Sequence, residues 1–413
     1  MKKRSARNWI GLLTVLILAV AAARILGLDF EYFWSRRSHL ADIVTGMIPP
    51  DWGYAGKVIL PLLATIQMSV TGTFLGAFLA LLFAPLCAGS CKFPAWLRGI
   101  LKVLIQITRS FPALILALMA TFVFGLGTFA GTAALTIYTF AILVRLTYED
   151  VESQPRRAFA VIRTMGCGRG RAYIRGIVPE ILPAFLTNTF YLLEANVRQS
   201  AILGYVGAGG LGLLLNEKMS WREYAKAGMV LLLLLGTVCL IEWISQSLSE
   251  IVRGERRIST KVKRCLIVSG GCVFLICTVT IQPPDFSHTS LTVLSNMLLG
   301  FIQPDVSFMT DLTHSGLLWL LLETILISFL GTLLGALLSF PLSIFNTRRL
   351  MPAPVSLIFR FLALGIRAVP FLIYGLIFVR VTGQGAFTGV LTIGICSVGL
   401  ITKRFTQAIE AMD

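Results

Sequence analysis

The chain has 413 residues, of which 56% are hydrophobic and only 14% are charged. A soluble domain cannot keep so much apolar surface hydrated, so this composition predicts a polytopic membrane protein. The formal net charge of +16 would by itself suggest a nucleic-acid partner. Lys and Arg gather in the cytoplasmic loops of membrane proteins, however, and this explanation makes nucleic acid an unexpected partner.

Long apolar segments alternate with polar loops along the whole chain. Because a span must satisfy its own backbone hydrogen bonds, we expect an all-α protein with about ten transmembrane helices. Every alternate loop is basic, which predicts a multi-pass protein of the cell (inner) membrane with both termini in the cytoplasm. The expected spans cover about residues 9–28, 57–88, 103–124, 132–146, 179–203, 227–248, 265–281, 317–345, 355–381 and 386–401.

The second half of the chain repeats the first at an offset of 259 and then 258 residues. The segment ATIQMSVTGTFLGAFLA at 64–80 returns as ETILISFLGTLLGALLS at 323–339, and both later helices return in the same order. Repeats of this kind fold alike. We therefore expect a complete six-helix domain at 1–250, a basic cytoplasmic linker at 251–264, and a second copy at 265–413 truncated after about four helices.

Charged and amide side chains inside apolar helices are costly, and they are the first candidates for a translocation path or gate. Glu194 and Arg198 stand four residues apart in the favourable order for an ion pair. A structural ion pair between packed helices is an equally good interpretation of these two residues. The candidates are Arg109, its repeat counterpart Arg367, Glu194, Asn196 and Arg198.

Glycines recur at helix-packing and turn positions. Those at Gly72 and Gly76 are four residues apart, which lets helices approach closely in lipid. The cluster Gly207, Gly209, Gly210 and Gly212 contains the spacing of a dinucleotide-binding loop, but it lies between two membrane spans. A tight turn explains it better. The eight Cys and three His residues form no metal-ligating pattern, so no metal site is expected.

Two stretches together resemble the permease subunit of phosphonate-type ABC importers, the inner-membrane component of binding-protein-dependent transport systems. The first is LLEANVRQSAILGYVGAGGLG at 192–212. The second is a basic loop in which Gly166 and Pro179 keep the family spacing of thirteen residues. The resemblance covers about residues 45–250 and again 299–413. Ala160 departs from the pattern, because the family has an acidic residue there.

The resemblance implies the type I ABC-importer transmembrane fold. It also implies a cytoplasmic ABC ATPase dimer and an extracytoplasmic solute-binding protein as partners, with a second permease chain as a further candidate. The ATPase would dock on the loop that contains Arg156, Arg157, Ala160, Gly166 and Pro179. The chain has no Gly-x-x-x-x-Gly-Lys-Ser/Thr loop. We therefore expect no enzymatic activity and no cofactor bound directly, with ATP used by the partner.

The expected function is a permease for phosphonate or related phosphorus oxyanions. Three alternatives remain open from the sequence. An importer permease for another small solute, such as methionine or glycine betaine, would share the glycine-rich segment. A secondary transporter would need no ATPase and should have paired broken helices with acidic residues at mid-membrane. A non-functional truncated product is the third alternative.

Overall fold

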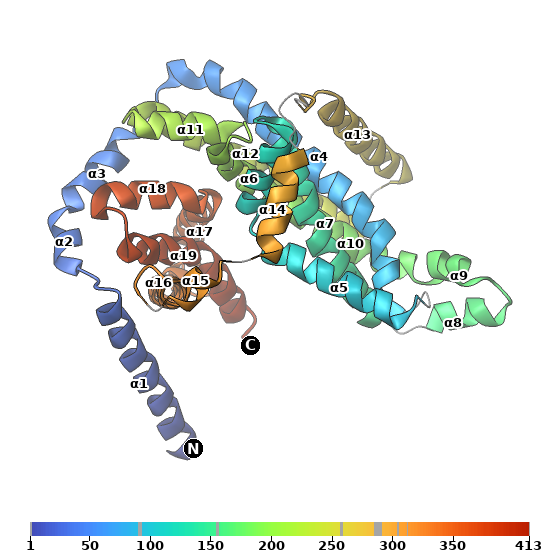
Figure 1. Ribbon diagram of the computed structural model, residues 1–413, viewed down its shortest axis with the longest axis horizontal. Coiled ribbons are helices and arrows are strands. Elements are labelled where there is room, and N and C mark those ends of the chain that lie inside the picture. The colour runs from blue at the N-terminus through green and yellow to red at the C-terminus, as the bar shows by residue number, and fades with distance from the viewer. Residues whose placement is uncertain are drawn as a thin grey trace. The chain divides into compact units, whose positions relative to one another are not determined.

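The computed structural model describes residues 2–89, 93–153, 157–256, 259–284, 291–303, 305–311 and 313–412. These residues form helices and no β-strand, which confirms the all-α prediction (Figure 1). The elements are α1 Lys2–Ile25, α2 Phe30–Ser35, α3 Arg37–Gly46, η1 Trp52–Tyr54, α4 Ala55–Cys87, α5 Ala95–Ser110, α6 Ala113–Phe124, α7 Thr128–Ser153, α8 Arg157–Thr164, α9 Arg169–Gly176, α10 Val178–Leu203, η3 Gly204–Val206, α11 Leu211–Ser220, α12 Tyr224–Arg253, α13 Thr260–Val279, α14 Leu291–Ile302, α15 Val306–Thr310, α16 Leu317–Asn346, α17 Ala353–Ala368, α18 Phe371–Thr382 and α19 Ala386–Glu410.

Some of the expected spans are single straight helices, and others are bent pairs of helices. Within the described residues, six helices are long and apolar enough, namely α4, α7, α12, α13, α16 and α19, and three bent pairs could add up to three more spans. The expected first span appears as the shorter apolar stretch Leu13–Ile25 of α1. Each of the ten expected spans falls on one of these six helices, on one of the three bent pairs, or on Leu13–Ile25.

Three of the expected spans are sharply bent. Helices α5 and α6 meet at 94°, α17 and α18 at 85°, and α9 and α10 at 57°. Pro112 and Pro370 immediately precede α6 and α18. A proline donates no backbone hydrogen bond, and it keeps the preceding residue out of the helical region. Phe111 and Val369 are accordingly extended, and the chain turns there.

The internal repeat is a structural repeat. Helices α4 to α7 return as α16 to α19 in the same order, and α5 to α7 begin 258 residues before their counterparts. The turns agree as well, since φ is 80° at Gly125 and 79° at Gly383. An ion pair also recurs. Lys102 Nζ lies 3.0 Å from Glu152 Oε1, and Arg360 Nη2 lies 2.8 Å from Glu410 Oε1, at equivalent positions.

The close packing of α4 on α7, and of α16 on α19, depends on glycine. A methyl group added at Gly72 would stand 2.7 Å from Leu135 Cβ, and one added at Gly76 would stand 2.7 Å from the carbonyl oxygen of Thr136. Gly331 and Gly335 make the equivalent approaches of 2.7 Å to Ile393 Cβ and 2.7 Å to the carbonyl oxygen of Gly394. The packing role predicted for Gly72 and Gly76 therefore agrees with the geometry in both repeats.

The compact units of the structure do not follow the expected domain boundaries. One unit comprises residues 1–50, 223–228 and 299–413, and the other comprises residues 51–222 and 229–298. In the first unit, Ala22 of α1 packs with Leu330 of α16 and Val390 of α19. Each compact unit thus contains helices from both halves of the sequence.

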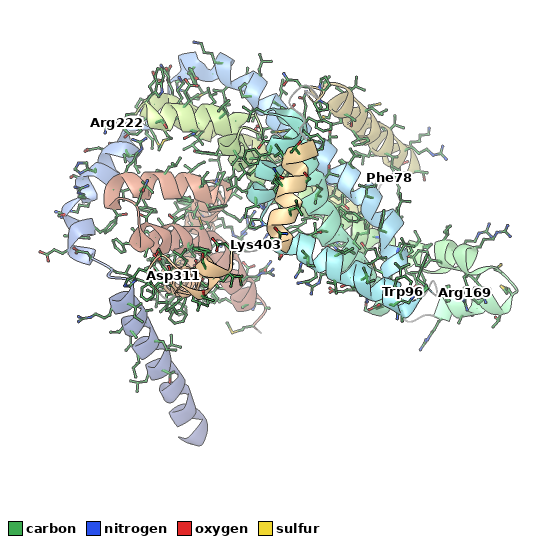
Figure 2. All side chains as sticks on the ribbon, in the orientation of Figure 1. Phe78, Trp96, Arg169, Arg222, Asp311 and Lys403 are labelled. Carbon is green, nitrogen blue, oxygen red and sulfur yellow. The ribbon has the colours of Figure 1, made fainter. Side chains whose placement is uncertain are left out.

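Helix α13 comes from the second half of the sequence, but it packs in the unit that contains α4. Phe274 of α13 packs edge-on against Phe74 of α4 with ring centroids 5.9 Å apart, and Gln67 donates to the hydroxyl of Thr280 over 3.0 Å. Most of α13 is otherwise exposed. Large apolar side chains also project outward elsewhere, as Figure 2 shows for Phe78 of α4 and Trp96 of α5, which are 62% and 67% exposed. Surfaces of this kind are suited to lipid.

Short helices occupy two regions that the sequence left as external loops. Helix α11 lies within the stretch 204–225, and α14 and α15 lie within 282–316. Asp305 caps α15, where it accepts from the hydroxyl of Ser307 over 2.6 Å and from the amide of Phe308 over 3.3 Å. These hydrogen bonds hold the pKa of Asp305 below its usual value.

Candidate translocation and coupling site

The Glu194–Arg198 pair forms on α10 as expected. Arg198 Nη1 donates to Glu194 Oε1 over 2.6 Å, and the two side chains are only 18% and 9% exposed. The helical offset of four residues places the two charges on one face, with the acidic residue nearer the N-terminus. A pair this short and this well shielded can neutralise two charges that would each be expensive alone in a membrane.

Asn196 lies on another face of α10 and has a different environment. It is fully buried, and its side-chain amide donates to Thr73 of α4 over 2.8 Å and to Thr139 of α7 over 2.7 Å. One turn further along α10, the hydroxyl of Ser200 accepts a hydrogen bond from Ser69 of α4 over 2.9 Å. Together these contacts form a buried polar clamp that joins α4, α7 and α10.

The polar clamp, composed of Ser69, Thr73, Thr139, Asn196 and Ser200, was not predicted as a unit. The sequence presented Ser69 and Thr73 only as repeated letters in α4, and Thr139 carried no signal. Side-chain hydrogen bonds between membrane helices commonly hold them together. These contacts place Asn196 between packed helices, away from the Arg198 face, and its assignment to a path or gate stays a prediction.

The glycine cluster makes the turn between α10 and α11. Gly207, Gly209 and Gly210 have φ angles of 84°, 76° and 78°, which only glycine adopts readily. A methyl group at Gly212 would collide with the carbonyl oxygen of Ala201. The cluster therefore acts as a turn and a close-packing site, as the sequence indicated. It follows a helix and precedes another, so it lacks the strand that a dinucleotide loop requires.

This glycine turn is fixed by two neighbouring elements. The amide of Gly127 donates to the carbonyl of Gly207 over 3.0 Å, and the amide of Leu211 donates to the hydroxyl of Thr65 over 2.9 Å. Ala208 and Leu211 are fully buried beneath it. Thr65 and Gly127 belong to the repeated motifs, so residues of the repeat hold the glycine turn in place.

Arg109 and Arg367 occupy equivalent places at the C-terminal turns of α5 and α17, just before the bends. Both side chains are half-buried. A cation is favoured at a helix C-terminus, where the unpaired carbonyl groups carry partial negative charge. The position is consistent with a structural role for both arginines, and their assignment to a path stays a prediction.

The predicted coupling loop forms a helical hairpin of α8 and α9, which projects beyond the ends of α5 and α7 (Figure 1). Gly166, with φ of 82°, makes the turn after α8. Gly176 lets α9 approach α8, since a methyl group there would stand 3.0 Å from the amide nitrogen of Phe159. Phe159 packs on the buried cluster around Tyr173 and Ile177, so one face of the hairpin is anchored.

The opposite face of the hairpin is open. Arg157, Ala160 and Arg163 are exposed, and so are the large apolar side chains Val161 and Met165, at 57% and 76%. Pro179 is exposed in the first turn of α10, and Arg156 lies outside the described residues. An exposed surface that mixes apolar and basic groups is suited to an acidic protein partner.

The described residues contain no group of three or more His, Cys, Asp or Glu side chains that could hold a metal ion. His39 and His314 lie in different places, and His288 is outside the described residues. The candidate site therefore consists of an ion pair, a polar clamp, a glycine turn and an exposed hairpin. These features occur in a chain of long apolar helices and are consistent with a membrane transport component.

Comparison with known proteins agrees with this class. Residues 72–249 match the family described as the binding-protein-dependent transport system inner membrane component. The chain covers 96% of the cryptic phosphonate transport permease PhnE2 of Escherichia coli K12 at 31% identity over 117 residues, which is 28% of this chain. The chain belongs to this family of transport permeases.

Two further relatives match longer segments. The phosphate-import permease PhnE of Mycolicibacterium smegmatis is 25% identical over 397 residues, which cover 91% of this chain and 71% of that protein. A phosphite transport permease of Stutzerimonas stutzeri, HtxC, is 24% identical over 254 residues, covering 62% of this chain and 90% of its own length. The first match runs through both halves of the chain.

Proposed function

We propose that this chain forms the translocation path of an ATP-driven importer for phosphorus oxyanions such as phosphonate, phosphite or phosphate. The observation that carries the proposal is the relative named for phosphate import, which aligns with 91% of the chain. Relatives named for phosphite and phosphonate transport share the same family. These solutes share a phosphorus centre with anionic oxygens, so one class of permease could serve them all.

The energy for transport would come from a partner. We propose that the exposed face of α8 and α9 docks on a cytoplasmic ABC ATPase dimer, because it is the open, basic and apolar surface of the hairpin. ATP would bind to that dimer and not to this chain. An extracytoplasmic solute-binding protein would deliver the solute, and a second permease chain is a further candidate partner. This arrangement requires the N-terminus to be cytoplasmic.

Within the membrane, the Glu194–Arg198 pair is the candidate for the path or gate. Its two side chains retain some exposure, in contrast to the fully buried Asn196. An ion pair at such a position could close a path while paired and open it when the helices move apart. Direct binding of the oxyanion by Arg198 is not required, since a binding protein would select the solute.

Uptake measurements test the proposed function. Cells that express the chain with its ATPase and binding protein should accumulate labelled phosphate, phosphite or a simple phosphonate, and should not accumulate methionine or glycine betaine. Uptake of methionine or glycine betaine in place of the phosphorus compounds would contradict the substrate assignment. Uptake that persists without any ATPase would instead favour a secondary transporter.

The docking surface can be tested separately. Arg157→Glu reverses a charge on the exposed face of α8, and Lys261→Glu makes the same change in the first turn of α13, away from the hairpin. We expect Arg157→Glu to lower both ATPase co-purification and uptake, while Lys261→Glu leaves both near the wild-type level. Equal behaviour of the two variants, or full uptake after deletion of residues 157–178, would rule out coupling through the hairpin.

A further inference from the structure

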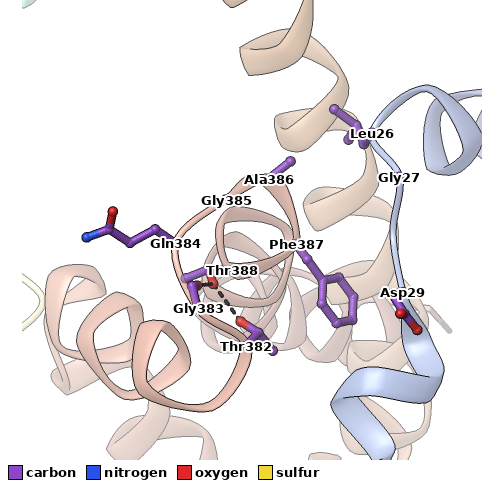
Figure 3. Close-up of a pocket in the computed structure, with 10 residues that line it drawn as sticks. All are labelled: Leu26, Gly27, Asp29, Thr382, Gly383, Gln384, Gly385, Ala386, Phe387 and Thr388. Atoms are coloured by element: carbon purple, nitrogen blue, oxygen red, sulfur yellow. Dashed lines mark hydrogen bonds between the residues drawn. The ribbon is translucent and has the colours of Figure 1, made fainter.

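The turn between α18 and α19 borders an open pocket. The pocket has a volume of about 230 Å³, and it is lined by residues 382–388 of the turn and by Leu26, Gly27 and Asp29 after α1. Figure 3 shows the segment Leu26–Asp29 facing this turn, with Gln384 directed away from it. Inside the turn, the hydroxyls of Thr382 and Thr388 lie 2.6 Å apart, and Thr388 donates to the carbonyl of Gly383.

The same turn in the first repeat is not open. Its counterpart, Gly125 to Thr128, is covered by the glycine turn that follows α10. Gly127 donates to the carbonyl of Gly207, and a methyl group at Gly209 would lie 3.3 Å from Thr128 Cγ2. The backbone of the two turns is alike, since φ is 142° at Gly127 and 150° at Gly385. The amide of Gly385 has no backbone partner among the described residues.

Thr65 of the first repeat and Thr324 of the second show the same contrast. Thr65 is fully buried, and its hydroxyl accepts the amide of Leu211 over 2.9 Å while it donates to the carbonyl of Pro61 over 2.8 Å. Thr324, its counterpart in α16, is exposed and donates to the carbonyl of Leu320 over 2.7 Å in the same way. Thr324 is therefore held in the conformation in which Thr65 accepts an amide from the glycine turn.

A third position completes the comparison. A methyl group at Gly131 would meet Met68 Sδ at 2.7 Å and Ala208 Cβ, from the glycine turn, at 3.3 Å. A methyl group at Gly389 would meet only Ile327, the counterpart of Met68, among its three nearest atoms. In the second repeat, Ile327 thus takes the place of Met68. Within the described residues, no atom takes the place that Ala208 has in the first repeat.

We propose that the pocket at residues 382–388 is a docking site for a polypeptide turn of the Gly207–Leu211 type, presented by a helix with the α10 pattern. The turn would accept the amide of Gly385 on one carbonyl and donate an amide to the hydroxyl of Thr324. No second copy of the pattern of residues 192–212 occurs elsewhere in this sequence. The proposal concerns assembly of the second repeat and is independent of the transported solute.

Protection of a cysteine from labelling tests the proposal. The full chain carries Thr324→Cys, and the probe is a separate polypeptide of residues 178–221, which contains α10, the glycine turn and α11. Maleimide labelling is read at residue 324 by mass spectrometry, so the native cysteines do not interfere. We expect rapid labelling of Thr324→Cys alone and at least about tenfold slower labelling with saturating probe, as for an accessible group removed from solvent. Thr65→Cys should react slowly with or without the probe.

Two matched controls make the result decisive. Leu322→Cys lies on the opposite side of α16 and is 41% exposed, so its labelling should not respond to the probe. A probe carrying Gly209→Val and Gly210→Val cannot adopt the left-handed turn, so it should not protect Thr324→Cys. Equal protection at residues 322 and 324, equal protection by the valine probe, or no protection at all would each overturn the proposal, the last leaving a pocket that holds only water.

Discussion

At the scale of single residues, α10 carries two kinds of polar contact on two different faces. One face carries an ion pair that keeps some exposure, and the other carries an amide with no exposure. The sequence predicted the first from the spacing of Glu194 and Arg198, because residues four apart share a helix face. The partners of Asn196 could not be predicted, since Thr73 and Thr139 are distant in sequence and threonine is common in membrane helices.

Exchange of the two charges distinguishes a gate from a structural pair. Arg198→Met removes the cation that lies 2.6 Å from the shielded Glu194 carboxylate and should lower stability in detergent by about 3 kcal/mol. The exchange Glu194→Arg with Arg198→Glu should recover most of that loss in thermal unfolding. If the pair lines the path, oxyanion uptake should stay low in the exchanged protein. Recovery of uptake together with stability would identify a purely structural pair.

The polar clamp should contribute to stability even though it contains no charge. Asn196→Ala removes two buried hydrogen bonds and should lower the unfolding free energy in detergent by about 1–3 kcal/mol. Asn216→Ala is the matched control, because Asn216 on α11 is half-buried and has a single contact of 3.5 Å with Ser220. If the two variants are equally stable, the clamp is not a source of helix association.

At the scale of elements, the sequence predicted helices well where apolar length alone decides them. The expected spans of 57–88, 317–345 and 386–401 correspond to α4, α16 and α19. The sharp bends were only partly predictable. A proline such as Pro112 favours a break because it donates no backbone hydrogen bond, but the angle of the bend depends on what packs around α6. Helix α11 was missed because its polar, glycine-flanked sequence is typical of a loop, and tertiary contacts to Thr65 stabilise it.

Helix contact through glycine gives a prediction for each repeat. A methyl group at Gly76 would meet backbone atoms of α7, so Gly76→Ala should force the helices apart and cost about 1–3 kcal/mol. Gly335→Ala should behave alike against α19. Gly99→Ala and Gly365→Ala, where nothing lies within 4 Å, should be neutral or slightly stabilising in thermal unfolding. A neutral Gly76→Ala variant would contradict the close approach of α4 and α7.

At the scale of the whole molecule, the two halves of the sequence exchange their first helices. Helix α1 belongs to the unit that contains α16 to α19, and α13 belongs to the unit that contains α4 to α7. The sequence predicted a domain boundary at the basic linker, because local hydrophobic pattern and charge are all that a linear reading offers. Packing between helices hundreds of residues apart leaves no local signal in apolar surfaces of this kind.

The exchange predicts that a cut chain stays together. A protease site inserted after Gly254 separates the sequence into two fragments, and packing of α1 on α16 and of α13 on α4 should keep them associated in detergent. The fragments should co-purify on a tag placed on either one. The same cut in a chain without residues 2–28 should weaken the association. Complete separation of the fragments from the otherwise intact chain would contradict the exchange.

The recurring ion pair of α5 with α7 and of α17 with α19 has a practical consequence. Lys102 in one repeat and Arg360 in the other pair with glutamates at equivalent positions, so each repeat can serve as the control for the other. A substitution can be made at Lys102 or at Arg360 in the same molecule, with the same pair of helices and an equivalent ion pair in both cases. Helices α8 to α10 follow the first copy. A defect common to both substitutions therefore reports on folding, and a defect confined to the first reports on transport.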